Sequence, residues 1–294
     1  FMSKILITGA SGFIGRRLTS YLESKGKSLI LISNKSMIDN SFSLNLINSS
    51  IPQKLFQDVD SVIHLAGKAH DLGNSRSLEY RQLNYEATIS LANSAYNAGV
   101  KHFIFVSSAK ANISQNEFMN SSFDTYATSK RKAEIELIEK YDSTEMIVSV
   151  ARPSLVYGPE LKGNLRSMIK ALKVRLFPLL PNLDNKKSMV HIDDLVIAIV
   201  LLMENNESHG KIFGITDGNV YSSDQILNTL IKIHNAKNPL WKISKPMLMF
   251  ISGDTGIRKK FLKLIEDDLV DDKEISNLGF KAQFSIENLY EKIF

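Results

Sequence analysis

Cysteine is absent from this chain of 294 residues, which excludes disulfide bonds and thiolate metal sites. Long apolar runs are also absent. The longest, residues 195–203, is too short to cross a bilayer core of roughly 30 Å as a helix and instead predicts a buried helix face. No basic and then apolar region follows Met2, so no signal peptide is indicated and we expect a cytoplasmic protein. Lysine and arginine form no block with interleaved aromatic residues, so nucleic acid is not an expected partner.

The remaining composition is that of an ordinary globular protein, with 44% hydrophobic and 23% charged residues. The length suits one large domain, or a large domain that carries a smaller lobe. A formal net charge of +5 describes a mildly basic protein and would also suit an anionic substrate.

Short apolar runs alternate with amphipathic segments through the first half of the chain. They predict strands at residues 4–8, 28–33, 60–66, 102–107 and 146–151, and helices at residues 14–24, 85–98 and 128–140. Continuous apolar strands between such helices indicate a parallel sheet that is covered on both faces. We therefore predict an α/β fold, a doubly wound Rossmann sheet with a smaller α/β C-terminal substrate lobe. The Rossmann domain spans residues 2–158, with 188–217 returning to it, and residues 159–187 and 218–294 form the lobe.

A glycine-rich turn joins the first predicted strand to the first predicted helix. Its sequence, Thr8-Gly-Ala-Ser-Gly-Phe-Ile-Gly15, has the pattern G-x-x-G-x-x-G. Glycines in this setting allow a tight turn and let backbone N–H groups approach a pyrophosphate, while the helix N-terminus adds partial positive charge. The turn predicts a dinucleotide site.

The end of the second strand should contact the adenosine ribose, where a carboxylate would favour NAD. This chain has Ser33, Asn34 and Lys35 there, and Arg16 and Arg17 follow the last glycine. Because these groups tolerate or favour a 2′-phosphate, the sequence favours NADP(H) over NAD, although the cations could equally be solvated surface charges.

Tyr126 and Lys130 are spaced i and i+4, which places both side chains on one face of a helix. A nearby ammonium should lower the pKa of a tyrosine, which is ordinarily near 10, so that the phenol can exchange a proton with an alcohol or carbonyl. Ser107 and Ser108 end a predicted strand, at the sheet edge where such folds bind ligands. Together with the glycine turn, these residues predict hydride chemistry.

At this point the chain resembles the extended short-chain dehydrogenase/reductase family, the NAD-dependent epimerase/dehydratase group. The resemblance covers nearly the whole chain and rests on the glycine turn, on Tyr126-x-x-x-Lys130, and on five further segments. These are Asp60-Ser-Val-Ile-His-Leu-Ala-Gly67 with Asn84, Val106-Ser-Ser108, Arg152-Pro-Ser-Leu-Val-Tyr-Gly-Pro159, Val190-His-Ile-Asp-Asp194, and Leu278-Gly-Phe280.

The resemblance implies that Ser108, Tyr126 and Lys130 are catalytic, with Tyr126 as the acid/base and Asn84 supporting the site. The predicted cofactor site comprises Gly9, Ser11, Gly12, Phe13, Ile14, Gly15, Ser33, Asn34, Lys35, Asn45, Leu46, Leu65, Ala66, Gly67, Tyr126, Lys130 and Pro153. The predicted substrate site comprises His70, Ser108, Lys110, Asn164 and Lys187. Lys187 stands where many members have arginine, so it keeps the charge but loses the bidentate fork.

Departures from the family pattern reduce the number of reactions that the sequence allows. Many 4-epimerases carry asparagine at Leu155 and Tyr-Gly after the serine strand, where this chain has Lys110, Ala111 and Asn112. Dehydratases place Asp-Glu after the catalytic serine, where this chain has Ala109 and Lys110. The chain looks closer to bacterial enzymes that act on UDP-N-acetyl-6-deoxyhexosamines for surface polysaccharide.

Three functions stay open. The first, which the sequence favours, is reduction of a 4-keto UDP-N-acetyl-6-deoxyhexosamine by NAD(P)H in surface polysaccharide synthesis. The second is a UDP-sugar 4-epimerase with tightly held NAD, acting on UDP-glucose or UDP-N-acetylglucosamine. The third is a non-catalytic NADP-binding sensor, which the retained tyrosine and lysine disfavour.

Other features carry weaker expectations. His64 is expected to be a satisfied core histidine, and His191 with Asp193 and Asp194 to be structural, so no metal is expected. A homodimer is usual for the family. The apolar segment 241–257, broken by Pro246 and two glycines, could pack on a partner or cap the substrate site.

Overall fold

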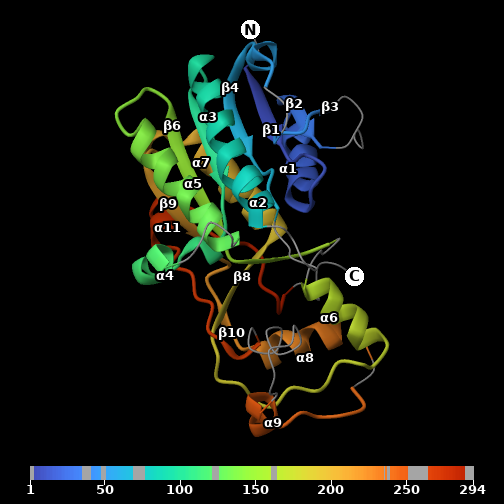
Figure 1. Cartoon of the computed structure of the whole chain (residues 1–294). Coiled ribbons are helices and arrows are strands. Elements are labelled where there is room, and N and C mark those ends of the chain that lie inside the picture. Colours follow the sequence, from blue (N-terminus) through green and yellow to red (C-terminus); the bar gives the residue numbers. More distant parts are fainter. Residues whose placement is uncertain are drawn as a thin grey trace. The chain divides into compact units, whose positions relative to one another are not determined.

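The computed structural model describes residues 3–34, 41–47, 51–68, 77–120, 126–159, 164–234, 236, 239–250 and 264–288. Two compact units divide the chain. The first unit is Phe1–Pro153, Leu195–Ile215 and Asp272–Phe280, and the second unit is Ser154–Asp194, Thr216–Asp271 and Lys281–Phe294. Figure 1 shows the elements of both units.

Seven parallel strands form the sheet of the first unit, in the order β3-β2-β1-β4-β5-β6-β9. The strands are β1 (Lys4–Thr8), β2 (Ser28–Ser33), β3 (Ser41–Ser43), β4 (Val59–His64), β5 (His102–Val106), β6 (Ile147–Pro153) and β9 (Lys211–Ile215). The chain steps outward from β1 to β3 and then returns to the other side of β1. This reversal makes the sheet doubly wound, and ligands of such sheets bind beyond the carboxyl ends of the strands beside it.

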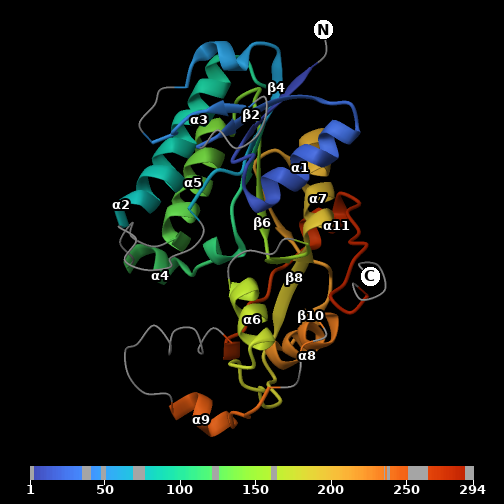
Figure 2. The same ribbon diagram turned by 90° about the vertical axis from the view of Figure 1, so that its right-hand side faces the viewer.

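Helices cover both faces of this sheet. Figures 1 and 2 show α2, α3 and α5 on one face and α1 and α7 on the other. Their bounds are α1 (Phe13–Ser24), α2 (Ser77–Tyr80), α3 (Ala87–Asn97), α5 (Tyr126–Tyr141) and α7 (Ile192–Glu204). Shorter elements are the 3₁₀ turns η1 (Gln53–Phe56), η3 (Ala109–Ala111) and η4 (Asn206–Ser208), the π-helical turn η2 (Arg81–Glu86), α4 (Gln115–Asn120) and α11 (Lys273–Asn277).

Apolar side chains from strands and helices meet between these layers. Leu6, Phe103 and Val148 on the sheet and Leu91 and Leu137 on the helices are fully buried. Each side chain of this kind contributes about 1.5–3 kcal/mol when it leaves water, so the face carrying α3 and α5 is firmly held to the sheet.

The second unit has a three-stranded sheet in the order β10-β8-β7. Its elements are β7 (Leu155–Tyr157), α6 (Asn164–Lys173), β8 (Lys187–His191), β10 (Val220–Tyr221), α8 (Ser223–Ile233) and α9 (Lys245–Phe250). A capping box formed by Ser222 and Gln225 starts α8, and Leu172, Met189 and Leu227 lie in the core of the unit.

The predicted Rossmann fold is confirmed, but several boundaries differ from the sequence analysis. Residues 154–158 belong to the second unit, and residues 272–280 belong to the first. Strand β8 pairs with β7 and β10 in the small sheet, so only the later part of residues 188–217 joins the first unit. A fully buried strand looks alike in either sheet, so periodicity alone could not assign it. Strand β4 also ends at His64 instead of residue 66, and the Ala66 N–H donates to the Thr8 side chain instead of a backbone carbonyl.

Among the described residues, no helix combines the length and the apolar character that crossing a membrane requires.

Candidate active site

The glycine turn between β1 and α1 is closely packed. Gly9 has φ +70°, and its carbonyl accepts a hydrogen bond of 2.9 Å from the Gly12 N–H. A Cβ on Gly9 would lie 2.7 Å from the Ala66 nitrogen, and one on Gly15 would lie 2.2 Å from the Gly9 oxygen. These contacts are with backbone atoms that cannot move aside cheaply, so the turn requires glycine at both positions.

The start of α1 suits a diphosphate. Gly12 is the N-cap residue, no side chain caps the helix, and no acidic residue lies in its first turn. The first N–H groups of an α-helix lack partners within the helix and favour a bound anion. Ser11, Phe13 and Ile14 are partly exposed around this end, so the residues present fit a dinucleotide pyrophosphate.

The predicted ribose and adenine contacts follow β2 and β3. Ser33 is buried and Asn34 is exposed, while Lys35 lies outside the described residues. Asn45 is exposed, and its side-chain oxygen accepts a hydrogen bond of 3.0 Å from the Ile47 N–H. Leu46 packs on the core. Carbonyl oxygens carry two lone pairs, so Asn45 retains capacity for an adenine amino group.

The segment after β4 lies against β1 on one side and α5 on the other. The Leu65 N–H donates to the Thr8 carbonyl at 3.2 Å. Gly67 is exposed, and a Cβ there would lie 3.2 Å from the Lys130 Nζ and 3.0 Å from the Asn84 Oδ1. A side chain at this position would crowd Lys130 and Asn84, so glycine lets the segment pack closely against both.

A chain of hydrogen bonds crosses the sheet beneath this segment. The Ala66 N–H donates to the Thr8 Oγ1, which lies 2.6 Å from the His64 Nδ1. The His64 Nε2 lies 2.8 Å from the Thr88 Oγ1, and the Thr88 hydroxyl donates to the Asn84 carbonyl. Because the only hydroxyl proton of Thr88 is already donated to the Asn84 carbonyl, the His64 Nε2 must donate to Thr88. The His64 Nδ1 must then accept from Thr8. Both ring nitrogens of His64 are therefore satisfied.

The charge state of His64 follows from its surroundings. Burial, and to a smaller extent the Lys130 ammonium, lower the pKa of His64 to about 3. His64 is therefore neutral at ordinary pH and acts as a fixed link between β1, β4 and α3.

Asn84 lies in the π-helical turn before α3 and is fully buried. Its Oδ1 accepts from the Lys68 N–H at 2.8 Å, and its Nδ2 donates to the Lys68 carbonyl and to the Ser129 Oγ, both at 3.2 Å. Asn84 thus ties the segment after β4 to α5, which carries Tyr126 and Lys130. π-Helical turns often occur at functional sites.

Lys130 is almost fully buried on α5. Its Nζ donates to the Val106 carbonyl at 3.1 Å and lies 4.5 Å from the centre of the Phe105 ring. Burial lowers the pKa of Lys130 to about 8, while the Glu134 carboxylate acts in the opposite direction. The ammonium is therefore held next to the carboxyl end of β5.

Tyr126 begins α5 and is partly exposed, with its ring edge-on to Tyr80 at 6.2 Å between ring centres. Burial raises the pKa of Tyr126, and Tyr80 and Glu134 raise it further, whereas a side-chain hydrogen bond with Ser108 lowers it. The expectation that Lys130 lowers this pKa is not met. In the structure the lowering influence comes from Ser108, and burial outweighs it.

The two serines after β5 have different surroundings. Ser108 is partly exposed and accepts from the Lys110 N–H at 3.3 Å, which starts η3. Ser107 is buried, and its hydroxyl has no hydrogen-bond partner in the described part of the chain. An orphaned buried hydroxyl is costly, so this edge of the sheet fits a polar ligand. Pro153 ends β6 in a buried position.

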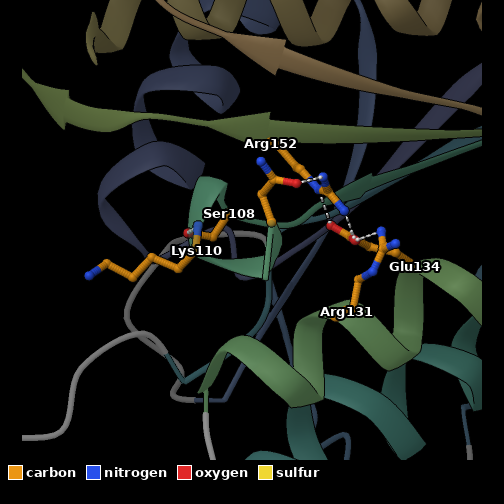
Figure 3. Close-up of polar contacts among 6 residues, drawn as sticks. Ser108, Lys110, Arg131, Glu134 and Arg152 are labelled. Atoms are coloured by element: carbon orange, nitrogen blue, oxygen red, sulfur yellow. Dashed lines mark hydrogen bonds and ion pairs between the residues drawn. The ribbon is translucent and has the colours of Figure 1, made fainter. Parts of the chain in front are cut away.

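A buried ion pair lies one helical turn from Lys130. The fully buried Glu134 accepts from the Arg152 Nε at 2.8 Å, and a second bond joins the Arg152 Nη2 to the other carboxylate oxygen. Arg131 adds a contact of 3.5 Å, and the Arg152 Nη1 donates to the Asn112 Oδ1 at 3.3 Å. Figure 3 shows Arg152 reaching from β6 to Glu134.

Arg152 thus links the segment that follows Ser108 with the helix that carries Tyr126 and Lys130. Sequence reasoning missed this pair, although the i+4 spacing of Glu134 from Lys130 was a signal that both share a helix face. It also missed the hydrogen bonds of Lys68 and Ser129, for which no sequence signal exists.

The predicted substrate residues are distributed over both units. Lys110 is exposed in the first unit, and in Figure 3 its side chain points away from the Arg152–Glu134 pair. Asn164 begins α6 and Lys187 begins β8, both in the second unit, and Lys187 is largely buried. His70 lies outside the described residues.

Comparisons with known proteins agree with this geometry. The family model of the NAD dependent epimerase/dehydratase family matches residues 5–216. A UDP-glucose 4-epimerase from Vibrio cholerae is 26% identical over 98% of this chain and 93% of that protein. An N-acetyl-alpha-D-glucosaminyl-diphospho-ditrans,octacis-undecaprenol 4-epimerase from Escherichia coli O157:H7 is 25% identical over 96% of this chain and 91% of that protein.

A solved structure shows the same fold. MoeE5, determined in complex with UDP-glucose and NAD, superposes with a TM-score of 0.75 at 20% identity, over 98% of this chain and 96% of that one. The family match spans the glycine turn, the segment after β4, and the helix with Tyr126 and Lys130. The chain therefore belongs to the NAD dependent epimerase/dehydratase family and is an enzyme of the extended short-chain dehydrogenase/reductase kind.

Proposed function

We propose that this enzyme is a UDP-sugar 4-epimerase that uses a dinucleotide held on the first unit. The observation that carries the proposal is the convergence of Ser108, Tyr126 and Lys130 at the carboxyl end of β5, where the Gly67 backbone packs closely against Lys130. Two of the relatives that cover nearly the whole chain are 4-epimerases, which supports this reaction. A third is a dTDP-D-glucose 4,6-dehydratase, a reaction that Ala109 and Lys110 after Ser108 disfavour.

The chain's own residues would manage the proton of the reacting hydroxyl. Bound NAD(P) supplies the acceptor and donor of hydride. Tyr126 would take the proton from the sugar 4-hydroxyl as the 4-ketone forms. It would return that proton to the same oxygen once the ketone presents its opposite face, so no net oxidation occurs. Ser108 would donate a hydrogen bond to the same oxygen, and the Lys130 ammonium would hold the nicotinamide ribose.

The remaining predicted residues would bind the two ligands. The glycine turn, Ser33, Asn34, Asn45 and the segment 65–67 would hold the dinucleotide, with Pro153 beside the nicotinamide. His70, Lys110, Asn164 and Lys187 would contact the nucleotide sugar, with the two cations near its phosphates. In this assignment the first unit binds the cofactor. Of the four substrate residues, His70 and Lys110 belong to the first unit and Asn164 and Lys187 to the second.

A net 4-keto reductase of UDP-N-acetyl-6-deoxyhexosamines is the second candidate. Lys110, Ala111 and Asn112 stand where many 4-epimerases have Tyr-Gly, and Ser33 stands in place of a carboxylate at the end of β2. Both departures favour this alternative. A buried serine there does not repel a 2′-phosphate, so NADPH could serve as a consumable reductant.

One experiment separates the two candidates. Purified enzyme is incubated with UDP-N-acetylglucosamine or UDP-glucose without added dinucleotide, and the sugar is analysed by NMR. Appearance of the 4-epimer supports the epimerase. A fall in NAD(P)H absorbance with a 4-keto UDP-sugar, and no 4-epimer in the first assay, would favour the reductase.

A further inference from the structure

Exposed apolar side chains gather in the second unit where α6 ends and where α9 begins. Val174 is 64% exposed, Leu176 72%, Leu240 71%, Trp241 43% and Met247 55%. We call these five residues, with the cations between them, the α6–α9 surface. Single exposed apolar residues need no explanation, but five on two segments that pair through their backbones are a candidate surface for binding.

Backbone pairing brings the two parts of this surface together. The Leu179 N–H donates to the Trp241 carbonyl at 2.9 Å, and the Ile243 N–H donates to the Leu179 carbonyl at 3.1 Å. Ile243 is buried, so it anchors a segment whose neighbours Trp241 and Lys242 are exposed. Figures 1 and 2 both show α9 beside the segment that follows α6.

The end of α6 directs apolar side chains outward. Arg175 adopts φ +58°, and the Leu176 N–H donates to the Ala171 carbonyl at 2.8 Å, which is the Schellman arrangement. The residue at the Leu176 position of this motif often packs on the last helical turn, yet Leu176 is the most exposed of the five. A non-glycine residue in the left-handed region is uncommon. This conformation of Arg175 ends α6 directly before the exposed Leu176.

The two segments that form this surface carry charges of one sign. Residues 164–180 and 239–250 contain no aspartate or glutamate. They contain six cations: Arg166, Lys170, Lys173, Arg175, Lys242 and Lys245. Arg175 is partly exposed and the other five are exposed. Asp184 pairs with Lys245 at 3.2 Å, but both side chains are more than half exposed, so the pair neutralises little.

We propose that the α6–α9 surface docks on an anionic lipid bilayer. Tryptophan, leucine and methionine side chains enter the boundary between headgroups and acyl chains, and lysine and arginine bind the anionic headgroups around them. Docking of this kind needs no membrane-spanning helix. A second copy of the chain is a poorer occupant, because a twofold contact would bring two sets of six cations together.

The chain offers a built-in probe, because Trp241 is its only tryptophan. The full-length enzyme is titrated with vesicles of phosphatidylglycerol and phosphatidylcholine in equal parts, and with phosphatidylcholine alone. On the anionic vesicles we expect a blue shift of Trp241 emission, quenching by brominated acyl chains, and loss of both at high salt. Emission unchanged by anionic vesicles would overturn the proposal.

Variants test whether this surface carries the binding. Lys170→Glu/Lys173→Glu/Lys242→Glu should weaken the vesicle partition by at least on the order of tenfold, since each cation contributes to attraction by anionic lipid. The matched control Lys54→Glu/Lys140→Glu/Lys211→Glu makes the same charge change at exposed positions of the first unit and should bind as the parent does. Equal weakening in both variants would show attraction by net charge and overturn docking through this surface.

Lipid quenching of serine variants and sedimentation of the lipid-free enzyme separate membrane insertion from self-association. Leu176→Ser/Leu240→Ser should reduce quenching by brominated lipid, and unchanged quenching would contradict insertion. Sedimentation of the lipid-free enzyme tests the second-copy alternative: self-association that these serine substitutions abolish would assign the surface to a dimer and overturn the proposal. Thermal melts check that each variant is folded. None of these readouts depends on catalysis, so failure here leaves the proposed epimerase function untouched.

Discussion

Arg152 holds the Glu134 carboxylate with two hydrogen bonds, and Glu134 lies one helical turn from Lys130. All three side chains are nearly or fully buried. A buried charge is costly without a partner, so the pair constrains where β6 and α5 meet, and its negative end helps to keep the Lys130 ammonium protonated.

Glu134→Gln should destabilise the protein by about 3–5 kcal/mol, because it leaves the Arg152 guanidinium buried without a counter-ion. Urea unfolding measures the change. The double variant Glu134→Gln/Arg152→Gln removes both charges and should lose less stability than the single variant. A single variant as stable as the parent would show that the pair contributes nothing to the fold.

The same substitution should move the pH profile of the reaction. Glu134 raises the pKa of Lys130, which burial holds at about 8. If the ammonium is needed, kcat/KM falls as pH rises through that value. Glu134→Gln should show this fall at lower pH, because it removes the charge that raises the pKa of Lys130. An unchanged basic limb would remove Glu134 from the electrostatics of the site.

Tyr126→Phe should lower kcat by about 10²- to 10⁴-fold, the usual contribution of a positioned acid or base, while dinucleotide binding is retained. Calorimetry measures the binding and NMR the turnover. Tyr141→Phe is the matched control: it loses a hydroxyl bonded to Asn93, away from the Ser108 hydrogen bond, and should keep its activity. Full activity in Tyr126→Phe would contradict the proposed proton transfer.

Stability should fall below pH 6.5 because of His64. In the unfolded chain this histidine takes up a proton near pH 6.5, whereas in the folded protein its pKa is about 3. The unfolded state therefore binds more protons between these values, and stability drops by up to about 1.4 kcal/mol per pH unit. Unfolding in urea at several pH values should show a shallower slope for His64→Gln. An identical slope would mean that His64 titrates alike in both states.

Gly15→Ala should disrupt the turn and abolish dinucleotide binding. The added Cβ would meet the Gly9 carbonyl oxygen at 2.2 Å, a backbone atom. Gly26→Ala serves as the control: Gly26 has φ +69° but nothing within 4 Å of the added Cβ, so only the backbone preference of about 1 kcal/mol is lost. Thermal melting and dinucleotide titration compare the two. Equal effects would show that close packing at Gly15 is unimportant.

Asn34→Asp should weaken NADP binding more than NAD binding. Asn34 is exposed directly after β2, where a carboxylate would accept from a ribose 2′-hydroxyl and repel a 2′-phosphate. Dissociation constants for both dinucleotides measure the change. Equal weakening for both would place the ribose elsewhere.

Much of the site could be predicted because its signals are local. The strand at residues 28–33 and the turn from Gly9 to Gly15 depend on short apolar runs and on the lack of a Cβ, which are visible in sequence. The Tyr126–Lys130 spacing sets both side chains on one helix face wherever the helix packs. The sequence by itself therefore determined the doubly wound class and the residue types of the candidate site.

Tertiary structure decided what depends on partners distant in the chain. Strand β8 pairs with β7 and β10 in the small sheet. Its apolar residues would suit either sheet, so the sequence could not assign it. His64 is neutral because it is buried between Thr8 and Thr88, and the pKa of Tyr126 is raised because burial outweighs Ser108. Burial and charge placement depend on which segments meet in space, and no local pattern of residues records that.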